Sequence, residues 1–333
     1  MISDQKIRIL VLGKKGGILH WFENVLDAMA DFRNVEVCPF SVNYFGLVDR
    51  LKKNAIKKFN RQWFDRLVGN QFNAVMQSFR PDLVLIVDCF YVPPEIFEVL
   101  NSKKKSTFVA WWIGDLSDFQ NLARLECIDK FYFTDTYFVK KAAEVGINNT
   151  SYLPLACNSR VYSLKNQANR DSRMVFVGAY APNREKLLRQ VSRPMIIVGN
   201  RWDQMASSVH NIHAKRISLQ KVDEIYNRHI CVLNIKNSDN VVNGLNMRTF
   251  DAAASGCIVL NDAVSDLEYC FDIGKELLVY RDVDELNDTV ERIIRDDSEC
   301  RAIAKAGRRR VLAEHLYQHR IATILSDFFQ ARE

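Results

Sequence analysis

The sequence has no long hydrophobic run, no paired cysteine motif and no low-complexity segment, and each absence excludes a class of protein. No stretch of ~18 consecutive apolar residues occurs, so we expect no membrane-spanning helix. Asp4 precedes the first short apolar run, so we expect no secretory signal peptide. The eight cysteines include no Cys-x-x-Cys pair, and several lie inside apolar runs. This pattern favours a reducing, cytoplasmic setting and gives no indication of a zinc site.

What remains is an ordinary globular composition. The 333 residues are 48% hydrophobic and 26% charged, and this length predicts two domains of ~150 residues each. The net charge of +6 permits anionic partners, such as a nucleoside diphosphate or a lipid surface, without requiring nucleic acid.

Short apolar runs alternate with helical patterns along the chain, which predicts an α/β fold with parallel sheets covered on both faces. Strands are expected near residues 7–12, 35–40, 82–87, 108–113, 131–133, 152–153, 174–178, 195–199, 230–235 and 257–260. Helices are expected near residues 19–32, 45–79, 223–227, 249–255, 283–295, 298–314 and 315–329.

The stretch 243–256, NGLNMRTFDAAASG, is the most informative part of the chain. We expect a helix from Thr249 that ends at Gly256, with the amides of Leu245, Asn246 and Met247 near its N-terminus. A helix N-terminus carries roughly half a positive charge, which suits a phosphate. Gly244 permits a tight turn, and Arg248 adds a guanidinium that can bind phosphate through two hydrogen bonds. The alternative is an ordinary strand-loop-helix-strand unit of any α/β protein.

This stretch also carries a family resemblance, together with WWIGD (111–115), the segment 266–271, GKELLVYRDVDEL (274–286) and EHLYQHR (314–320). The chain resembles the spore-maturation CgeB-like branch of the GT-B glycosyltransferases. The resemblance implies a GT-B fold of two Rossmann-like domains facing across a cleft. Residues 1–155 would form the acceptor-side domain, with helix 315–333 packing back on it, and residues 173–314 would bind the nucleotide sugar.

The resemblance also implies particular site residues in the second domain. Retaining members carry two glutamates, at positions matched here by Asn243 and Asp251. Asp251 would hold the ribose hydroxyls, whereas Asn243 has lost the charge that usually contacts the donor sugar. Arg184 matches a cation for the diphosphate, and Lys186 could assist it.

In the first domain the resemblance points to two loops. The turn after the first strand, GKKGG (13–17), would place Gly16, Gly17 and His20 at the cleft. A glycine-rich turn there brings backbone close to a ligand, although this one lacks a full dinucleotide or phosphate-loop pattern. Asp115 would contact the acceptor or donor sugar; its alternative role is a helix cap.

The segment 45–79 combines lysines with aromatic side chains in a helical pattern. Its lysines and arginines include Lys52, Lys53, Lys57, Lys58, Arg61 and Arg66. A basic amphipathic helix of this kind can lie on an anionic membrane surface. The alternative is a helix with an apolar face on the core and a solvated basic face.

Together these observations predict a hexosyltransferase that moves a sugar from a UDP- or GDP-sugar to a glycan, protein or lipid-linked acceptor. We expect no cofactor and no metal, because the helix terminus with Arg184 and Arg248 can neutralise the leaving diphosphate. Asp115, Arg184 and Asn243 are the candidate catalytic residues. The expected location is the cytoplasm, with peripheral contact at the inner face of the membrane as a further option. The alternatives are a nucleotide-sugar epimerase, a non-catalytic nucleotide-sugar binder and a nucleic-acid binder.

Overall fold

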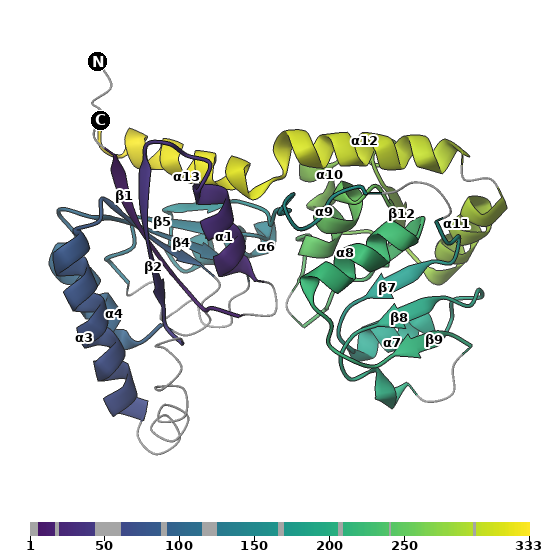
Figure 1. Cartoon of the computed structure of the whole chain (residues 1–333), viewed down its shortest axis with the longest axis horizontal. Coiled ribbons are helices and arrows are strands. Elements are labelled where there is room, and N and C mark those ends of the chain that lie inside the picture. The colour runs from purple at the N-terminus through teal and green to yellow at the C-terminus, as the bar shows by residue number, and fades with distance from the viewer. Residues whose placement is uncertain are drawn as a thin grey trace. The chain divides into compact units, whose positions relative to one another are not determined.

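The computed structural model describes residues 6–16, 20–43, 61–87, 92–114, 125–165, 170–205, 209–239, 241–295 and 298–333. The chain divides into two compact units (Figure 1). Unit 1 comprises Met1–Leu153 and Tyr317–Glu333, and unit 2 comprises Pro154–Leu316.

Unit 1 is built on a parallel sheet of six strands in the order β2-β1-β3-β4-β5-β6. The strands are β1 (Ile7–Gly13), β2 (Val35–Ser41), β3 (Leu83–Val87), β4 (Phe108–Ile113), β5 (Lys130–Phe133) and β6 (Thr150–Tyr152). The three central strands are apolar on both faces because helices cover both sides of the sheet.

Each face of this sheet has its own helical cover. On one face, alternate strand residues such as Leu10 and Ile86 pack with α3 (Arg61–Phe79), α4 (Pro94–Lys103) and α6 (Thr136–Glu144). On the other face, Trp112 contacts Trp21 of α1 (Trp21–Met29) and Tyr317 of α13 (Tyr317–Gln330), with ring centroids 4.8 and 5.9 Å apart. The helix α13 therefore completes unit 1 although it follows unit 2 in the sequence.

Unit 2 holds the second parallel sheet, in the order β12-β11-β10-β7-β8-β9. Its strands are β7 (Val175–Val177), β8 (Ile196–Val198), β9 (Asn211–His213), β10 (Cys231–Asn234), β11 (Ile258–Asp262) and β12 (Leu278–Tyr280). Its helices are α7 (Pro182–Leu188), η1 (Trp202–Gln204), α8 (Leu219–Arg228), α9 (Met247–Ala254), α10 (Leu267–Cys270), α11 (Val283–Arg295) and α12 (Ser298–Glu314).

The strand order of unit 2 predicts where a ligand would bind. The chain runs from β7 outward through β8 to β9, then returns to place β10 on the opposite side of β7. In parallel α/β sheets, ligands bind beyond the carboxyl ends of the strands at such a switch point. The corresponding switch point in unit 1 lies between β1 and β3.

The α/β fold class predicted from the sequence is confirmed, and several element boundaries need correction. The helix α9 begins at Met247 rather than Thr249, because Asn246 caps it. The helix α8 spans Leu219–Arg228, longer than the predicted segment 223–227. The strand β9 was not predicted, since it is three residues long and its two polar residues, Asn211 and His213, are exposed at the edge of the sheet. The basic segment 44–60, Asp115 and Gly17 lie outside the described residues.

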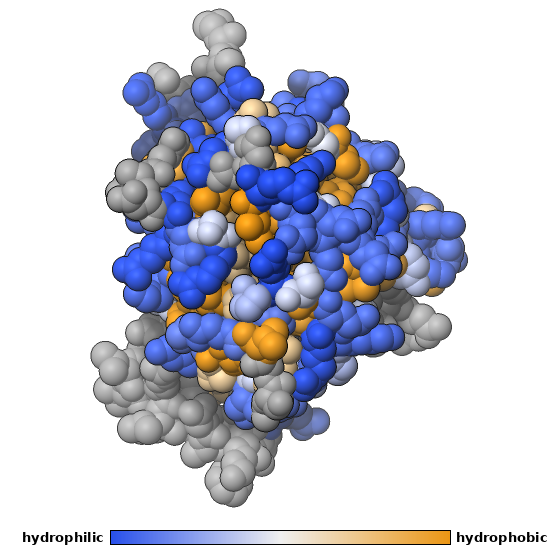
Figure 2. Space-filling view, turned by 90° about the vertical axis from the view of Figure 1, so that its right-hand side faces the viewer, coloured by the Kyte–Doolittle hydropathy of each residue, from blue (hydrophilic) through white to orange (hydrophobic). Residues whose placement is uncertain are grey.

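Within the described part of the chain, no helix is both long and apolar enough to span a membrane. The cysteines described are free thiols, and all but Cys38 are buried. Hydrophilic residues cover most of the face seen in Figure 2, with smaller apolar areas between them.

Candidate functional site

Two arginines meet at the switch point of unit 2. Arg184 lies in the first turn of α7 and Arg248 in the first turn of α9, beside the carboxyl ends of β7 and β10. The guanidinium carbons of Arg184 and Arg248 lie 5.6 and 6.0 Å from the centre of the Phe176 ring. A cation gains electrostatic stabilisation over an aromatic face. The structure therefore brings together the two cations that the sequence predicted from separate segments.

The Arg184 side chain is buried and is held by backbone carbonyl groups. Its Nε and Nη2 donate to the Ile235 carbonyl at 3.2 and 3.1 Å, and its Nη1 donates to the Ala179 carbonyl at 2.9 Å. These three bonds leave two of the five N–H donors of this guanidinium for a ligand. Arg184 is thus fixed in place before any ligand arrives.

Arg248 shares an acceptor with Arg184. Its Nε donates to Asn234 Oδ1 at 3.2 Å, and its Nη2 lies 3.5 Å from the Ile235 carbonyl. A Cβ added to Gly178 would clash with the Phe176 ring at 2.8 Å, whereas its distance to Arg248 Nη1, 3.5 Å, would be an ordinary contact. The glycine after β7 thus leaves room for the aromatic ring beside which the two guanidinium groups lie.

Charge at this site is unbalanced. Among the described residues, neither Arg184 nor Arg248 forms an ion pair with a carboxylate. Burial, followed by the positive charge of Arg248, lowers the pKa of Arg184, and burial also lowers the pKa of Arg248. The nearby Asp262 accepts a hydrogen bond from the Lys236 amide at 2.9 Å, and burial raises its pKa. Arg184 is buried and Arg248 is partly buried, and two neighbouring positive charges without a paired carboxylate among the described residues are suited to binding an anion.

The N-terminus of α9 lies beside these arginines but uses part of its own donor capacity. Asn246 caps the helix: its Oδ1 accepts from the Arg248 amide at 3.0 Å, and its carbonyl accepts from the Thr249 amide at 3.2 Å. The predicted role of Asn246 in contacting a phosphate therefore rests on its backbone rather than on its side chain. The side chains of Leu245 and Met247 are buried, so these residues also offer only backbone groups to a ligand.

Asn234, which the sequence analysis did not select, connects these parts. Its Oδ1 accepts from Arg248 Nε and from Asn246 Nδ2 at 3.0 Å, while its Nδ2 donates to Thr249 Oγ1 at 2.7 Å and to Asn261 Oδ1 at 2.5 Å. Asn234 and Asn261 follow the apolar residues of β10 and β11. A polar residue at the carboxyl end of a buried strand is the sequence signal that could have identified both.

Asp251 lies inside unit 2 and is only 4% exposed. The Cys157 thiol and the positive charge of Arg248 lie close enough to affect its carboxylate, and Oδ1 has no hydrogen-bond partner among the described residues. Burial is the largest cause that raises the pKa of Asp251 well above its usual value. An unpaired buried carboxylate oxygen is costly, and it is available to a donor such as a hydroxyl group.

The loop before α9 is anchored at two adjacent carbonyl groups, those of Val242 and Asn243. The Asn243 carbonyl accepts from the Asp266 amide at 3.0 Å, and the Lys236 ammonium donates to the Val242 carbonyl at 2.9 Å. Gly244 is buried, whereas Asn243 is partly exposed. The predicted residues 243–248, Arg184 and Asp251 thus all belong to the region around the carboxyl ends of β7, β10 and β11.

In unit 1 only part of the predicted site is described. Gly16 has φ +71° and its amide donates to Glu23 Oε1 at 2.7 Å. His20 also has a left-handed backbone, with φ 48°, and its Nδ1 lies 4.0 Å from Glu23 Oε2. A positive φ at a residue with a side chain is uncommon, which makes His20 a constrained position at the start of α1.

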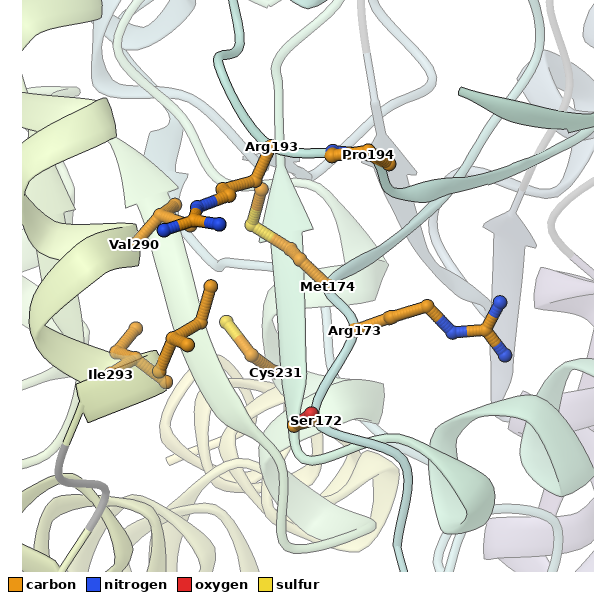
Figure 3. Close-up of a pocket in the computed structure, with 9 residues that line it drawn as sticks. Ser172, Arg173, Met174, Arg193, Pro194, Cys231, Val290 and Ile293 are labelled. Carbon is orange, nitrogen blue, oxygen red and sulfur yellow. The ribbon is translucent and has the colours of Figure 1, made fainter. Parts of the chain in front are cut away.

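A separate cavity of about 280 Å³ lies at the amino ends of the unit 2 strands, opposite the carboxyl ends that bear the arginines (Figure 3). It lies where β7, β8 and β10 begin, and Met174, Cys231, Val290 and Ile293 give it an apolar lining. The side chain of Arg193 at its rim is paired with Glu291 at 2.5 and 2.7 Å. Because its lining is apolar and its cations are paired, this cavity is not the anion site.

Comparisons with known proteins agree with this geometry. Residues 184–326 match the profile of a family described as glycosyl transferase-like, and no curated protein matches the chain. A glycosyltransferase structure from Rickettsia africae is similar, with 11% identity and a TM-score of 0.70, covering 98% of both chains. HepE from Anabaena, solved in complex with UDP-glucose, has 12% identity and a TM-score of 0.64, covering 96% of this chain and 100% of that chain.

A third similar structure is a putative UDP-N-acetylglucosamine 2-epimerase from Listeria monocytogenes. It has 10% identity and a TM-score of 0.58, covering 98% of this chain and 97% of that chain. At these identities the likenesses establish the fold. The chain has the GT-B fold, as the sequence predicted.

Proposed function

We propose that this chain transfers a sugar from a nucleoside diphosphate sugar to an acceptor. The observation that carries the proposal is the pair of guanidiniums of Arg184, which is buried, and Arg248, which is partly buried. They share the Ile235 carbonyl, and neither forms an ion pair with a carboxylate of the described residues. They lie at the switch point of the unit whose residues match the glycosyl transferase-like profile. A diphosphate is the anion that such a pair fits, since two guanidiniums can divide its negative charge.

Catalysis would consist mainly of positioning and of stabilising the leaving diphosphate. As the bond between sugar and phosphate breaks, negative charge grows on the phosphate oxygens, and cations fixed in advance stabilise it without reorganising. Arg184 is fixed in this way by its three bonds to backbone carbonyls. Arg248 and the N-terminus of α9 would act on the same group.

The remaining roles are part of the proposal. Asp251 would accept hydrogen bonds from the ribose hydroxyls through its unpaired Oδ1. Asn243 would lie towards the donor sugar, and Asp115 together with Gly16 and Gly17 would serve the acceptor side. We further propose that the chain is a CgeB-like hexosyltransferase that retains the anomeric configuration.

We also propose that the reaction needs no metal. An Asp-x-Asp spacing, which can hold a metal in other proteins, does occur at Asp282–Asp284. Asp282 Oδ1, however, accepts from the Glu285 amide at 2.9 Å at the start of α11, so this carboxylate caps a helix. The cations proposed for the diphosphate are instead Arg184 and Arg248.

The test is a panel of nucleotide sugars, scored by thermal stabilisation and by slow hydrolysis of the donor. Ligands that bind only the native state raise its melting temperature according to their affinity. Arg184→Ala should weaken the binding of both the bare nucleoside diphosphate and the sugar-bearing donor. Arg189→Ala is the matched control, because Arg189 is an exposed arginine near the same helix that pairs with Glu185. If no nucleotide or nucleotide sugar stabilised the wild type, the proposal would be wrong.

A nucleotide-sugar binder without catalysis is the second candidate, and Asn243 favours it. An amide stands where the resembling family carries a carboxylate, so the donor could be held without being cleaved. This candidate predicts stabilisation by nucleotide sugars with no hydrolysis and no transfer. An epimerase would instead convert the donor sugar without any acceptor, which product analysis of the same reactions detects.

A further inference from the structure

The side chain of Asn234 takes part in several hydrogen bonds inside unit 2, and the proposed function gives it no role. Its side chain is 1% exposed, and each of its two amide atoms forms two hydrogen bonds within the protein. An amide carries two donors and two acceptor positions, so its capacity is filled. Its own carbonyl also accepts from the Tyr280 hydroxyl at 3.1 Å. Such a residue determines the positions of its neighbours.

The two acceptor bonds of Asn234 lead to the proposed anion site. One comes from Arg248 Nε and the other from Asn246, the residue that caps α9. The Oδ1 atom therefore fixes both the guanidinium of Arg248 and the start of the helix that carries it. The two donor bonds, to Thr249 and Asn261, prevent the amide from turning round.

The geometry points to Asn234 as the positioning residue that aims Arg248 at the diphosphate of the donor. This inference rests on the proposed function. A neutral amide suits the task better than a carboxylate, because it holds the guanidinium without neutralising its charge. The charge remains available to the ligand, and Asn234 itself need not touch the ligand.

Two substitutions separate the placement of Arg248 from its charge. Asn234→Ala removes the acceptor, so Arg248 should lose its fixed position. Asn234→Asp keeps an acceptor and adds a negative charge, so Arg248 should stay in place but be neutralised. Thr249→Val is the control, since it removes a hydroxyl of the same network that does not touch Arg248, and the bond from Asn234 Nδ2 to Asn261 Oδ1 still holds the amide in place.

The first measurement needs no nucleotide. Hydrogen exchange of the Arg248 Nε–H is followed by NMR of protein labelled with ¹⁵N-arginine, and the signal is identified by its absence from Arg248→Lys. Losing a hydrogen bond to a charged donor should speed exchange by about tenfold or more in Asn234→Ala. Exchange should remain slow in Asn234→Asp and in Thr249→Val. Equal exchange rates in Asn234→Ala and Thr249→Val would overturn the inference.

The second measurement compares UDP and GDP with uridine and guanosine by calorimetric titration. Both Asn234 variants should lower the affinity for the diphosphates by about tenfold relative to the affinity for the nucleosides. Thr249→Val should leave the ratio of the two affinities unchanged. A ratio that did not change in either Asn234 variant would also overturn the inference. If the wild type bound none of these ligands, the proposed function would fail, while the exchange measurement would still decide whether Asn234 positions Arg248.

Discussion

Replacing Asp251 by asparagine should raise the stability of the protein at neutral pH while weakening nucleotide binding. The carboxyl group is 4% exposed, its Oδ1 has no partner among the described residues, and burial raises its pKa well above the usual 3.8. A carboxyl with a raised pKa in the native state favours the protonated form. Its contribution to stability is complete below its unfolded pKa and is lost as the pH rises towards its folded pKa.

The magnitude follows from proton linkage. In the interval between the unfolded and the folded pKa, the native state binds up to one more proton than the unfolded state. The free energy of unfolding should then fall by up to ~1.4 kcal/mol for each pH unit. The asparagine that replaces Asp251 does not titrate, so the variant should lack this slope. The stability difference between Asp251→Asn and the wild type should therefore grow from pH 5 to pH 7.

His229 also titrates near this range, in the opposite direction. Burial lowers the pKa of His229 below 6.5 in the native state. The free energy of unfolding therefore decreases as the pH falls below 6.5, because the unfolded state binds the proton more readily. Because His229 is present in both proteins, its effect cancels in the difference between them.

The assay is urea denaturation of both proteins at half-unit steps of pH, with the free energy of unfolding extrapolated to water. Calorimetric titration with a nucleoside diphosphate gives the second readout. Hydrogen bonds donated by the ribose hydroxyls favour the ionised form of Asp251 in the complex, so losing them in Asp251→Asn should weaken binding by at least about tenfold. Parallel stability profiles for the two proteins would refute the assignment of a raised pKa. Unchanged nucleotide affinity would refute the role of Asp251 in the donor site.

Four further outcomes are expected. Asn243→Ala should spare binding of the bare nucleoside diphosphate and weaken only the sugar-bearing donor, as calorimetry would show. Donor turnover should survive EDTA; loss of turnover that manganese or magnesium restored would contradict the metal-free proposal. Charge reversal of the lysines at 52, 53, 57 and 58 should weaken binding to anionic vesicles, each contributing about 1 kcal/mol, and unchanged binding would favour the solvated face. Gly307→Ala should lower the melting temperature, because its Cβ would lie 2.1 Å from the Glu276 carbonyl and overpacking of about 1–3 kcal/mol exceeds the gain in helix propensity.

The sheets could be predicted because buried parallel strands have a local signature. Continuous apolar runs as short as 83–87 and 108–113 are typical of strands buried on both faces, and the observed strands match the expectation closely. The strand β9 lacks this signature, since its three residues pair with β8 at an exposed edge. Its position depends on the tertiary structure rather than on its own composition.

Candidate site residues could be selected from the sequence, but their environments could not. The loop residues and Arg184 were selected through spacing and resemblance, and their roles remain predictions. The contacts of Arg184 with the Ile235 carbonyl, and of Asp251 with Cys157, join segments that are distant in the sequence. No local pattern shows that a carboxylate will be buried or that a guanidinium will be bound by carbonyl groups. Asn234 was missed for the same reason, because its four partners come together only in the folded unit.

The position of α13 has a consequence for synthesis on the ribosome. Within unit 1, Phe328 packs on Phe108 with ring centroids 5.8 Å apart, and the Tyr132 hydroxyl donates to Asp327 at 2.8 Å. Asp327 and Phe328 are translated only after the whole of unit 2, which is one continuous segment of the chain. Unit 2 can therefore reach its native state first, although it is made second. Until residues 317–333 emerge, the nascent unit 1 must expose the apolar face that α13 will cover, and chaperones would find their target there.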